Sequence, residues 1–257
     1  MQTRAFLAGI IAYATGAAAQ TTLRVPAEYA TIQAAIDVAV AGATVLVAPG
    51  LYTGRAAREI RFRGKAITVR SEAGPASTTL DNGRSGTVFI FDGAEPPEAM
   101  LEGFTITGAT RSGVHITGAG ASPTIRNCVI DDCWNGLFGG GVAIDSGAGA
   151  TLIDCVIDRN LAGQGGAVNL QKGARATLEG CTLSNNRVDI TGGGALMAGE
   201  GCTVELINCL VIGNQAIGFA GSSAGVRIAR DSVGTLINCV VTENIASGVA
   251  AGVSFTN

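Results

Sequence analysis

The sequence has few of the side chains from which active sites and nucleic-acid contacts are usually built. Its 257 residues include one histidine, one tryptophan and 5% aromatic residues, and only 14% are charged. The net charge is −3 and no basic stripe runs along the chain, so we do not expect nucleic acid as a partner. Beyond residue 19 no apolar run is long enough to cross a bilayer, so the protein is not expected to span a membrane. Helical periodicity is also missing after about residue 40, which argues against crossover helices.

What the chain does contain is glycine, 38 residues of it, and one short sequence unit that recurs over residues 121–257. Each copy begins with a cysteine, and the steps between these cysteines are 27, 26, 28 and 30 residues: Cys128, Cys155, Cys181, Cys209 and Cys239. In the last four copies an asparagine lies five residues after the cysteine: Asn160, Asn186, Asn214 and Asn244. A repeat of about two dozen residues predicts a solenoid.

Two short runs of alternating character occur in each copy, such as Cys155-Val156-Ile157 and Val168-Asn169-Leu170. Alternation with a period of two indicates β-strands, and the Gly, Asn and Asp clusters between the runs indicate turns. Strands that recur without helices should stack in parallel and in register, about 4.8 Å apart. The predicted fold class is therefore all-β, a parallel β-helix of seven or eight coils.

Stacked coils would align the cysteines in one ladder and the asparagines in another. Cysteine is small and apolar, so a column of free thiols can fill a narrow interior. Asparagine tolerates a left-handed backbone and its amide can bond the amide of the next coil, which suits a turn. We interpret both ladders as structural. Cys133 and Cys202 lie off the cysteine ladder, and the sequence leaves their redox state open.

The N-terminal residues 1–19 have the pattern of a secretory signal. Arg4 precedes an apolar run over residues 5–14, and three alanines at residues 17–19 precede Gln20. We therefore expect an exported protein, secreted to the medium or held in the periplasm or on the cell surface, with no lipid anchor.

The remaining chain, residues 20–257, is predicted to be a single domain. Residues 26–42 form an N-terminal cap with a helix over residues 31–39, since a solenoid must cover its first coil. Residues 43–120 are irregular coils with strands at 44–48, 66–70 and 87–91, and residues 121–257 are the regular coils. No C-terminal cap is visible after Phe255, so we expect either a fragment or end-to-end association through the open coil.

Three segments resemble the N-terminal part of right-handed parallel β-helix proteins of the pectin-lyase-like superfamily. They begin Thr31-Ile32-Gln33, Val45-Leu46-Val47 and Gly64-Lys65-Ala66, and the Cys/Asn copies resemble the repeats of exported members. The resemblance implies a right-handed β-helix with a short N-terminal capping helix. The superfamily includes pectate and pectin lyases, polygalacturonases, tailspikes and adhesins, so the fold does not settle an activity.

The motifs of polygalacturonases are largely missing. Asp131-Asp132 resembles their Asp-Asp motif, but no Asn-Thr-Asp precedes it. The only histidine, His115, lies upstream, and Arg227-Ile228-Ala229 lacks the expected lysine. No residue is assigned a catalytic role on this basis.

A pectate lyase would need carboxylates for calcium and a base for the proton next to the uronate carboxyl. Asp131 and Asp158 each lie three residues after a ladder cysteine, so they should stack and point outward on neighbouring strands. Calcium between them is one interpretation, and no other cofactor is expected. The alternative is that both are solvated residues at turns, with Asp132 neutralised by Arg159.

The central residues of the second strand form another outward stripe. It contains His115, Ala143, Asn169, Met197, Arg227 and Ser254. In enzymes of the resembled superfamily such a face forms the glycan groove. His115, Asn169 and Arg227 are therefore candidate binding residues, together with Trp134 and Phe138, which we place in a loop.

Three hypotheses follow. The first is a non-catalytic exported β-helix that presents a flat outer face to glycans or other surface partners. The second is a calcium-assisted polysaccharide lyase or related carbohydrate-active enzyme acting on uronate polymers. The third is a structural or adhesin repeat.

Overall fold

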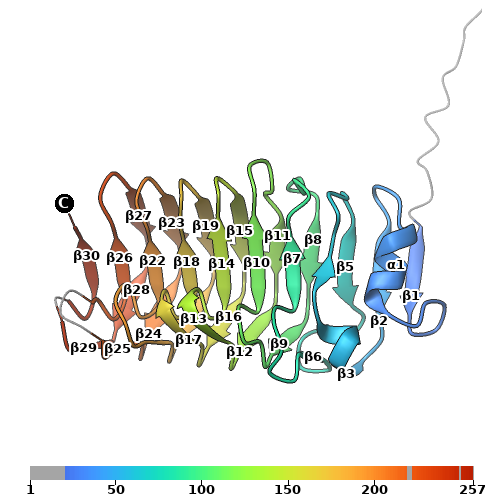
Figure 1. The fold of residues 1–257 in the computed structure, drawn as a ribbon, viewed down its shortest axis with the longest axis horizontal. Helices are drawn as coiled ribbons and strands as arrows, with labels where there is room; N and C mark the ends of the chain where they lie inside the picture. Colours follow the sequence, from blue (N-terminus) through green and yellow to red (C-terminus); the bar gives the residue numbers. More distant parts are fainter. Residues whose placement is uncertain (1–20, 219–221, 249, 257) are drawn as a thin grey trace, which may run out of the picture.

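The protein is a parallel β-helix in which four sheets run along the length of the molecule (Figure 1). The computed structural model describes residues 21–218, 222–248 and 250–256. Every pairing between strands is parallel and joins one coil to the next, as the repeat predicts. Helix α1 (Ile32–Val38) lies at one end of the molecule, and β30 lies at the other.

The four sheets are named A to D in this article. Sheet A consists of β1 (Thr22–Val25), β2 (Thr44–Val47), β5 (Thr68–Ser71), β8 (Met100–Glu102), β11 (Thr124–Arg126), β15 (Gly149–Ile153), β19 (Arg175–Glu179), β23 (Thr203–Ile207) and β27 (Val233–Ile237). Sheet B consists of β3 (Gly50–Thr53), β6 (Thr78–Asp81), β9 (Thr105–Thr107), β12 (Val129–Asp131), β16 (Val156–Asp158), β20 (Thr182–Ser184), β24 (Leu210–Ile212) and β28 (Val240–Thr242).

Sheets C and D form the side of the molecule that faces the viewer in Figure 1. Sheet C consists of β4 (Ile60–Arg61), β7 (Phe89–Phe91), β10 (Val114–Thr117), β14 (Val142–Asp145), β18 (Val168–Leu170), β22 (Leu196–Ala198), β26 (Val226–Ile228) and β30 (Val253–Phe255). Sheet D consists of β13 (Trp134–Phe138), β17 (Leu161–Gln164), β21 (Arg187–Val188), β25 (Gln215–Ala216) and β29 (Ile245–Ala246).

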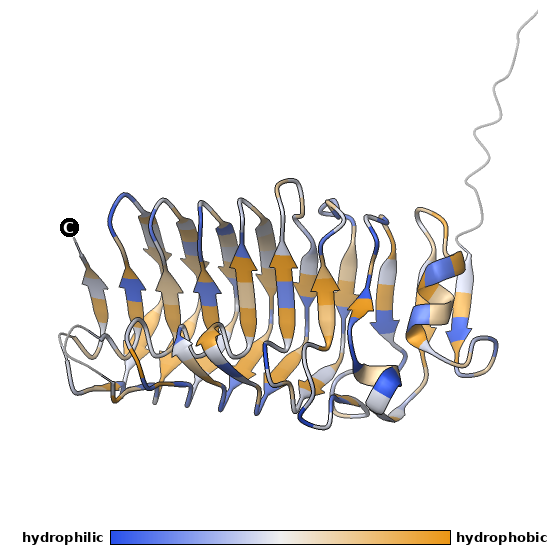
Figure 2. Cartoon of the chain, viewed as in Figure 1, coloured by the Kyte–Doolittle hydropathy of each residue, from blue (hydrophilic) through white to orange (hydrophobic). Residues whose placement is uncertain are grey.

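A continuous apolar interior runs through the coils, and hydrophobic residues concentrate mainly on the strands (Figure 2). Four buried phenylalanines fill the coils near the N-terminal end, and the Phe62 and Phe91 rings lie 4.5 Å apart. Later coils use Ile, Leu, Val, Ala and Cys instead, as expected where each strand contributes one or two inward side chains.

The cysteine ladder lies at the turn between sheets A and B, and all seven cysteines are free. Six are buried and Cys239 is half-buried, which confirms the expected column of free thiols. Each ladder thiol donates to main-chain carbonyls; that of Cys181 lies 3.4 Å from Leu152 O and 3.5 Å from Glu179 O. Burial raises the pKa of the Cys128 thiol to about 12, so it stays protonated at neutral pH.

The asparagine ladder lies at the turn between sheets B and D, and its amides form one continuous chain. Asn160 donates from both its backbone N and its Nδ2 to Asn186 Oδ1, at 3.0 Å each. Its Nδ2 also donates to Ile130 O at 2.9 Å. Asn186 bonds Asn214, and Asn214 bonds Asn244, in the same way. The predicted amide-to-amide bonding is confirmed.

The expectation of a left-handed backbone at the ladder asparagines is wrong. The residues with positive φ are the ones just before them, such as Arg159 at 50° and Asn185 at 53°. This preceding residue turns the chain, which leaves the asparagine itself free to direct its side chain into the turn. Cys133 takes the ladder position in the preceding coil, and its backbone N donates to Asn160 Oδ1 at 3.0 Å.

The predicted capping helix is confirmed as α1. Thr31 Oγ1 accepts from Ala34 N at 3.1 Å, and the helix buries Ile32, Ala35 and Ile36. Lys65 Nζ caps the C-terminal end of the helix by donating to the carbonyls of Ile36, Asp37 and Ala39 at 2.8–2.9 Å.

The helix is not the first element of the described chain. Strand β1 precedes it and pairs with β2 over four residues, so sheet A already begins before the cap. The predicted strands 44–48, 66–70 and 87–91 correspond to β2, β5 and β7. The predicted signal, residues 1–19, lies outside the described residues.

Candidate functional site

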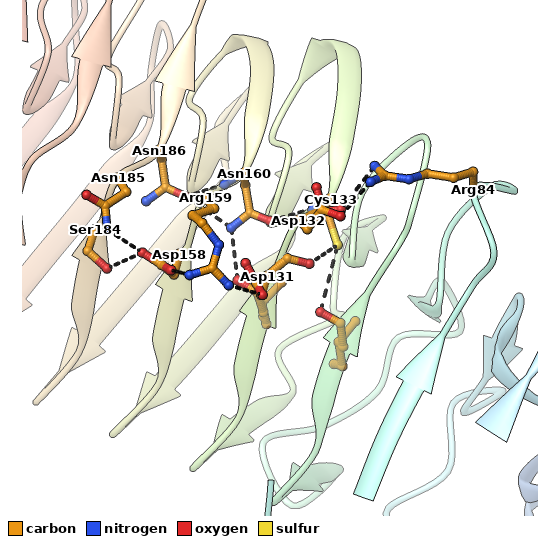
Figure 3. A network of polar contacts seen from close by, with 12 residues as sticks. Arg84, Asp131, Asp132, Cys133, Asp158, Arg159, Asn160, Ser184, Asn185 and Asn186 are labelled. Carbon is orange, nitrogen blue, oxygen red and sulfur yellow. Dashed lines mark hydrogen bonds and ion pairs between the residues drawn. The ribbon is translucent and has the colours of Figure 1, made fainter. Parts of the chain in front are cut away.

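The stacked carboxylates form one polar network on the outer side of sheet B (Figure 3). Asp131 and Asp158 are register partners in β12 and β16, as the sequence predicts. The guanidinium of Arg159 lies between them: Nη1 is 2.6 Å from Asp158 Oδ2, and Nη2 contacts Asp131 Oδ2. Asp158 Oδ1 accepts from Ser184 Oγ at 2.7 Å and from Asn185 Nδ2 at 2.8 Å. Arg159 therefore bridges the two carboxylates and offsets part of their negative charge.

Asp132 has a different partner from the one expected. Its carboxylate pairs with Arg84, which lies two coils earlier, and both residues have a positive φ. The partner assigned to Asp132 from the sequence is therefore wrong.

Asp131 is the less favourably placed member of the carboxylate pair. Burial raises its pKa, and the Arg159 charge only partly offsets this. Its Oδ1 is buried without a hydrogen-bond partner in the described structure. Within the described residues no three or more His, Cys, Asp or Glu side chains come together to hold a metal ion. A calcium ion between Asp131 and Asp158 would have to displace Arg159.

A groove with a volume of about 560 Å³ lies over sheet C. Its floor is the outer face of β7, β10 and β14, at Ile90, His115 and Ala143. One wall comes from the end of β13, where the side chains of Leu137 and Phe138 are exposed. Because its floor crosses successive coils, the groove follows the axis of the solenoid.

The wall of the groove is fixed by a small hydrogen-bond cluster. Asn135 Oδ1 accepts from Leu137 N at 3.0 Å and from Phe138 N at 3.3 Å. Asn135 Nδ2 donates to Ser112 Oγ at 3.1 Å, and Ser112 Oγ donates to Gly139 O at 2.6 Å. These bonds tie β13 to the segment before β10, so the wall is held in place without a ligand.

His115 lies in this groove and is oriented by an acidic partner in the next coil. Its Nε2 is 2.9 Å from Asp145 Oδ2. Asp145 Oδ1 also accepts from Thr117 Oγ1 and Ser146 Oγ, each at 2.6 Å. Burial alone would raise the pKa of Asp145, but these hydrogen bonds outweigh it and lower the pKa. The histidine is therefore a positioned polar group with an ionised partner.

The groove carries charges of both signs, from Arg61, Arg111, Glu59, Asp92 and Asp145. Arg61 pairs with Asp92 across its floor. Arg111 and Glu59 also line it, and neither has an ion-pair partner among the described residues. The groove thus offers hydrogen-bond donors and acceptors of both signs beside the apolar side chains of Leu137 and Phe138.

The predicted outward stripe is in register, but it is not a flat exposed face. His115, Ala143, Asn169, Met197, Arg227 and Ser254 occupy successive rungs of sheet C. Asn169 is only 1% exposed, and Ala143, Met197 and Ser254 are also buried. Arg227 Nη1 reaches Thr191 Oγ1 at 3.3 Å, away from the groove. The structure therefore groups only His115 and Ala143 of this stripe with the groove.

Trp134 and Phe138 have different surroundings. The sequence places both in a loop, which is wrong, since they begin and end strand β13 of sheet D. Trp134 is 45% exposed and pairs with Leu161, and it is not among the residues lining the groove. Phe138 lines both the groove and a smaller cavity beside it.

Sequence reasoning missed Asp145 and the ladder position of Cys133, although a signal for each was present. Asp145 stands three residues after Val142 at the end of the repeated second strand, where it is the register partner of Thr117. Cys133 lies five residues after Cys128, the same spacing that defines the asparagine ladder.

A family model described as "Right handed beta helix region" matches residues 76–233, more than half of the chain. The chain belongs to this family of right-handed β-helix proteins. The matched region of this β-helix protein includes most of the groove over sheet C and all but the last member of each ladder.

One similar solved structure is the crystal structure of the pectate lyase Pel9A. It aligns with a TM-score of 0.51 and 17% sequence identity, over 80% of this chain and 56% of that one. At this identity the likeness shows the fold alone, and the aligned part spans little more than half of the lyase. No curated protein matches the sequence. The described residues contain no helix that is long and apolar enough to cross a membrane.

Proposed function

We propose that this β-helix protein is an exported glycan-binding protein whose ligand lies in the groove over sheet C. The observation that carries the proposal is the groove itself, with Phe138 on its wall and His115 on its floor. An exposed ring can pack against the apolar face of a sugar. Side chains of both charges can meet the hydroxyl groups, which donate and accept hydrogen bonds.

The dimensions of the groove favour an extended ligand. It crosses four rungs, β4, β7, β10 and β14, which at about 4.8 Å for each of three steps gives about 14 Å of floor. Asn135 and Ser112 hold the wall in place, so little ordering free energy is lost on binding. A short stretch of an oligosaccharide along the solenoid axis meets these conditions.

The experiment is a binding screen of the purified protein against a panel of polysaccharides and their oligomers, followed by titration calorimetry on any hit. Phe138→Ala and Arg111→Ala should each weaken binding by about tenfold or more, which corresponds to about 1.4 kcal/mol. Leu51→Ala and Arg126→Ala are the matched controls, since both lie on other sheets and are exposed. Equal losses in the controls, or no binding to any glycan, would refute the proposal. In the second case a structural or adhesin role would be favoured.

Export is part of the same proposal and is supported by the sequence of residues 1–19. Expression of the full sequence in a secreting host should place the protein outside the cytoplasm, with a new N-terminus near Gln20. An intact N-terminus on a cytoplasmic product would contradict it.

A second candidate function, lyase chemistry, is favoured by one observation. His115 and Asp145 are the one His–carboxylate pair within the described residues, and they lie in the groove where a polymer would pass. A base held by a carboxylate partner is suited to proton abstraction. The assay is release of unsaturated uronate from polygalacturonate and alginate, followed by ultraviolet absorbance. Product that disappears in His115→Ala would make the protein an enzyme.

Calcium at Asp131 and Asp158 is a proposal that can be tested separately. Because Arg159 already bridges the two carboxylates, calcium should bind more tightly to Arg159→Ala than to the wild type. Calorimetric titration of both proteins with calcium measures this, and Asp158→Asn in the Arg159→Ala background should abolish binding. If Arg159→Ala does not bind calcium, the proposal of a calcium site at Asp131 and Asp158 is refuted.

A further inference from the structure

Beside the groove, and sharing Phe138, Ala143 and Asp145 with it, lies a smaller cavity of about 80 Å³. Its other lining residues are Ile144, Asn169, Gln171 and Lys172. On the same measure the cavity has about one seventh of the volume of the groove, so it suits a pendant group of a sugar better than a run of sugar rings.

The polar group in this cavity that has no partner is the Asn169 side chain. Asn169 is 1% exposed, and its Nδ2 has no hydrogen-bond partner in the part of the chain that the structure describes. The ladder amides show what a buried asparagine in this protein normally has: Asn186 Nδ2 bonds Ile157 O at 2.8 Å and Asn214 Oδ1 at 3.0 Å. A buried amide without such bonds costs free energy of folding. Its place at a cavity therefore points to a ligand group that accepts a hydrogen bond from it.

The surroundings of Asn169 restrict the charge of that ligand group. Asp145 borders the same cavity, and its hydrogen bonds to Thr117, Ser146 and His115 keep its carboxylate ionised. A second carboxylate placed beside it would be repelled. The apolar side chains of Phe138 and Ala143 also favour a ligand group with a neutral, partly apolar body.

We propose that this cavity is a specificity subsite for the acetyl group of an acetylated sugar, whose carbonyl oxygen accepts from Asn169 Nδ2 and whose methyl packs against Phe138 and Ala143. The proposal rests on the glycan groove, from which the acetyl group would project. An acetyl group combines a neutral acceptor with a methyl, which matches an unpartnered buried donor beside apolar side chains. The same group occurs as an amide on N-acetylated sugars and as an ester on O-acetylated ones.

The experiment compares matched oligosaccharides by titration calorimetry. The N-acetylglucosamine hexamer is compared with cellohexaose, in which a hydroxyl replaces the acetamido group. O-acetylated xylan oligomers are compared with the same oligomers after mild alkali, which removes ester acetyl groups only. We expect at least one acetylated member to bind tenfold or more tightly than its partner, and the pair that shows the difference identifies the source of the acetyl group. We expect Asn169→Leu to lose that preference, while Thr177→Ala on the outer face of sheet A keeps it.

A second measurement uses the wild type alone, so that it does not depend on a variant's folding. The side-chain amide signal of Asn169 in a nitrogen–proton correlation spectrum should shift on addition of the acetylated oligomer and stay unchanged with the matched partner. Equal affinity for acetylated and unacetylated oligomers would overturn the subsite and leave the groove standing. Tighter binding of an oligogalacturonate, lost in Lys172→Ala, would assign the cavity to a carboxylate instead. If no oligosaccharide of any kind binds, the subsite and the groove both fail.

Discussion

Asn186→Ala tests whether the asparagine ladder holds the coils together or merely fills space. Asn186 is fully buried, its Oδ1 accepts from Asn160 N and Asn160 Nδ2, and its Nδ2 donates to Ile157 O and Asn214 Oδ1. Truncation removes all four bonds and leaves the backbone N–H of Asn160 and the carbonyl of Ile157 without these buried partners. At about 1–3 kcal/mol for each unsatisfied buried group, we expect a loss of about 3–5 kcal/mol of unfolding free energy.

Asn169→Ala is the matched control within the same chain. The two asparagines are equally buried, but Asn169 forms no side-chain hydrogen bond that truncation could break. We expect its unfolding free energy to change by less than about 1 kcal/mol, because removal of an unpartnered buried amide offsets the lost packing.

Urea unfolding followed by circular dichroism measures both variants against the wild type. The two variants should differ clearly in their midpoints, with Asn186→Ala the less stable. Similar losses in both, or a loss below about 1 kcal/mol in Asn186→Ala, would refute the assignment of coil cohesion to the amide ladder.

Three further predictions concern the thiols, the cap and the groove. In native protein at pH 8 the six buried thiols should react only slowly with a thiol reagent, because burial raises the pKa of Cys128 and Cys133, for example, to about 12. All seven thiols should react in urea, and fast native labelling of more than the half-buried Cys239 would contradict this. Lys65→Met should lower stability by about 1–2 kcal/mol and speed amide exchange in α1, while exposed Lys172→Met should do neither. The folded-state pKa of Asp145 lies below its ordinary value of 3.8, so its contribution to stability is present above about pH 4 and is lost as the pH falls through the folded pKa. Asp145→Asn should therefore destabilise the protein at pH 7, and its effect should shrink as the pH falls below about 4; an effect that does not change with pH would exclude the charge as the cause.

The sequence predicts the repeating part of the fold well, because each coil repeats the same small set of constraints. A cysteine that must fit a narrow interior and an asparagine that must bond its counterpart recur at fixed offsets, so Cys181 and Asn186 mark equivalent positions in successive coils. The sequence predicts two strands in each regular coil, whereas the structure has four. Alternation at Val168-Asn169-Leu170 likewise identifies sheet C. The capping helix was predictable because Thr31 is an N-cap residue before an apolar face.

What the sequence could not give is the relation between the sheets. Whether Asn169 is exposed depends on how closely sheet D and its turns approach sheet C, and alternation only says which side of a strand a residue occupies. Pairs formed across coils, such as Arg84 with Asp132 and His115 with Asp145, join residues about one or two repeats apart. The Arg84–Asp132 pair depends on side-chain direction at two residues with positive φ, which no local pattern specifies.

The most direct test of the central claim is a crystal structure of the protein grown with the tightest-binding oligosaccharide from the panel. If the groove over sheet C binds glycans, we expect sugar rings over β7, β10 and β14, with one ring against Phe138 and hydrogen bonds to His115 or Arg111. Density on the outer face of sheet A or sheet B, with an empty groove over sheet C, would contradict it.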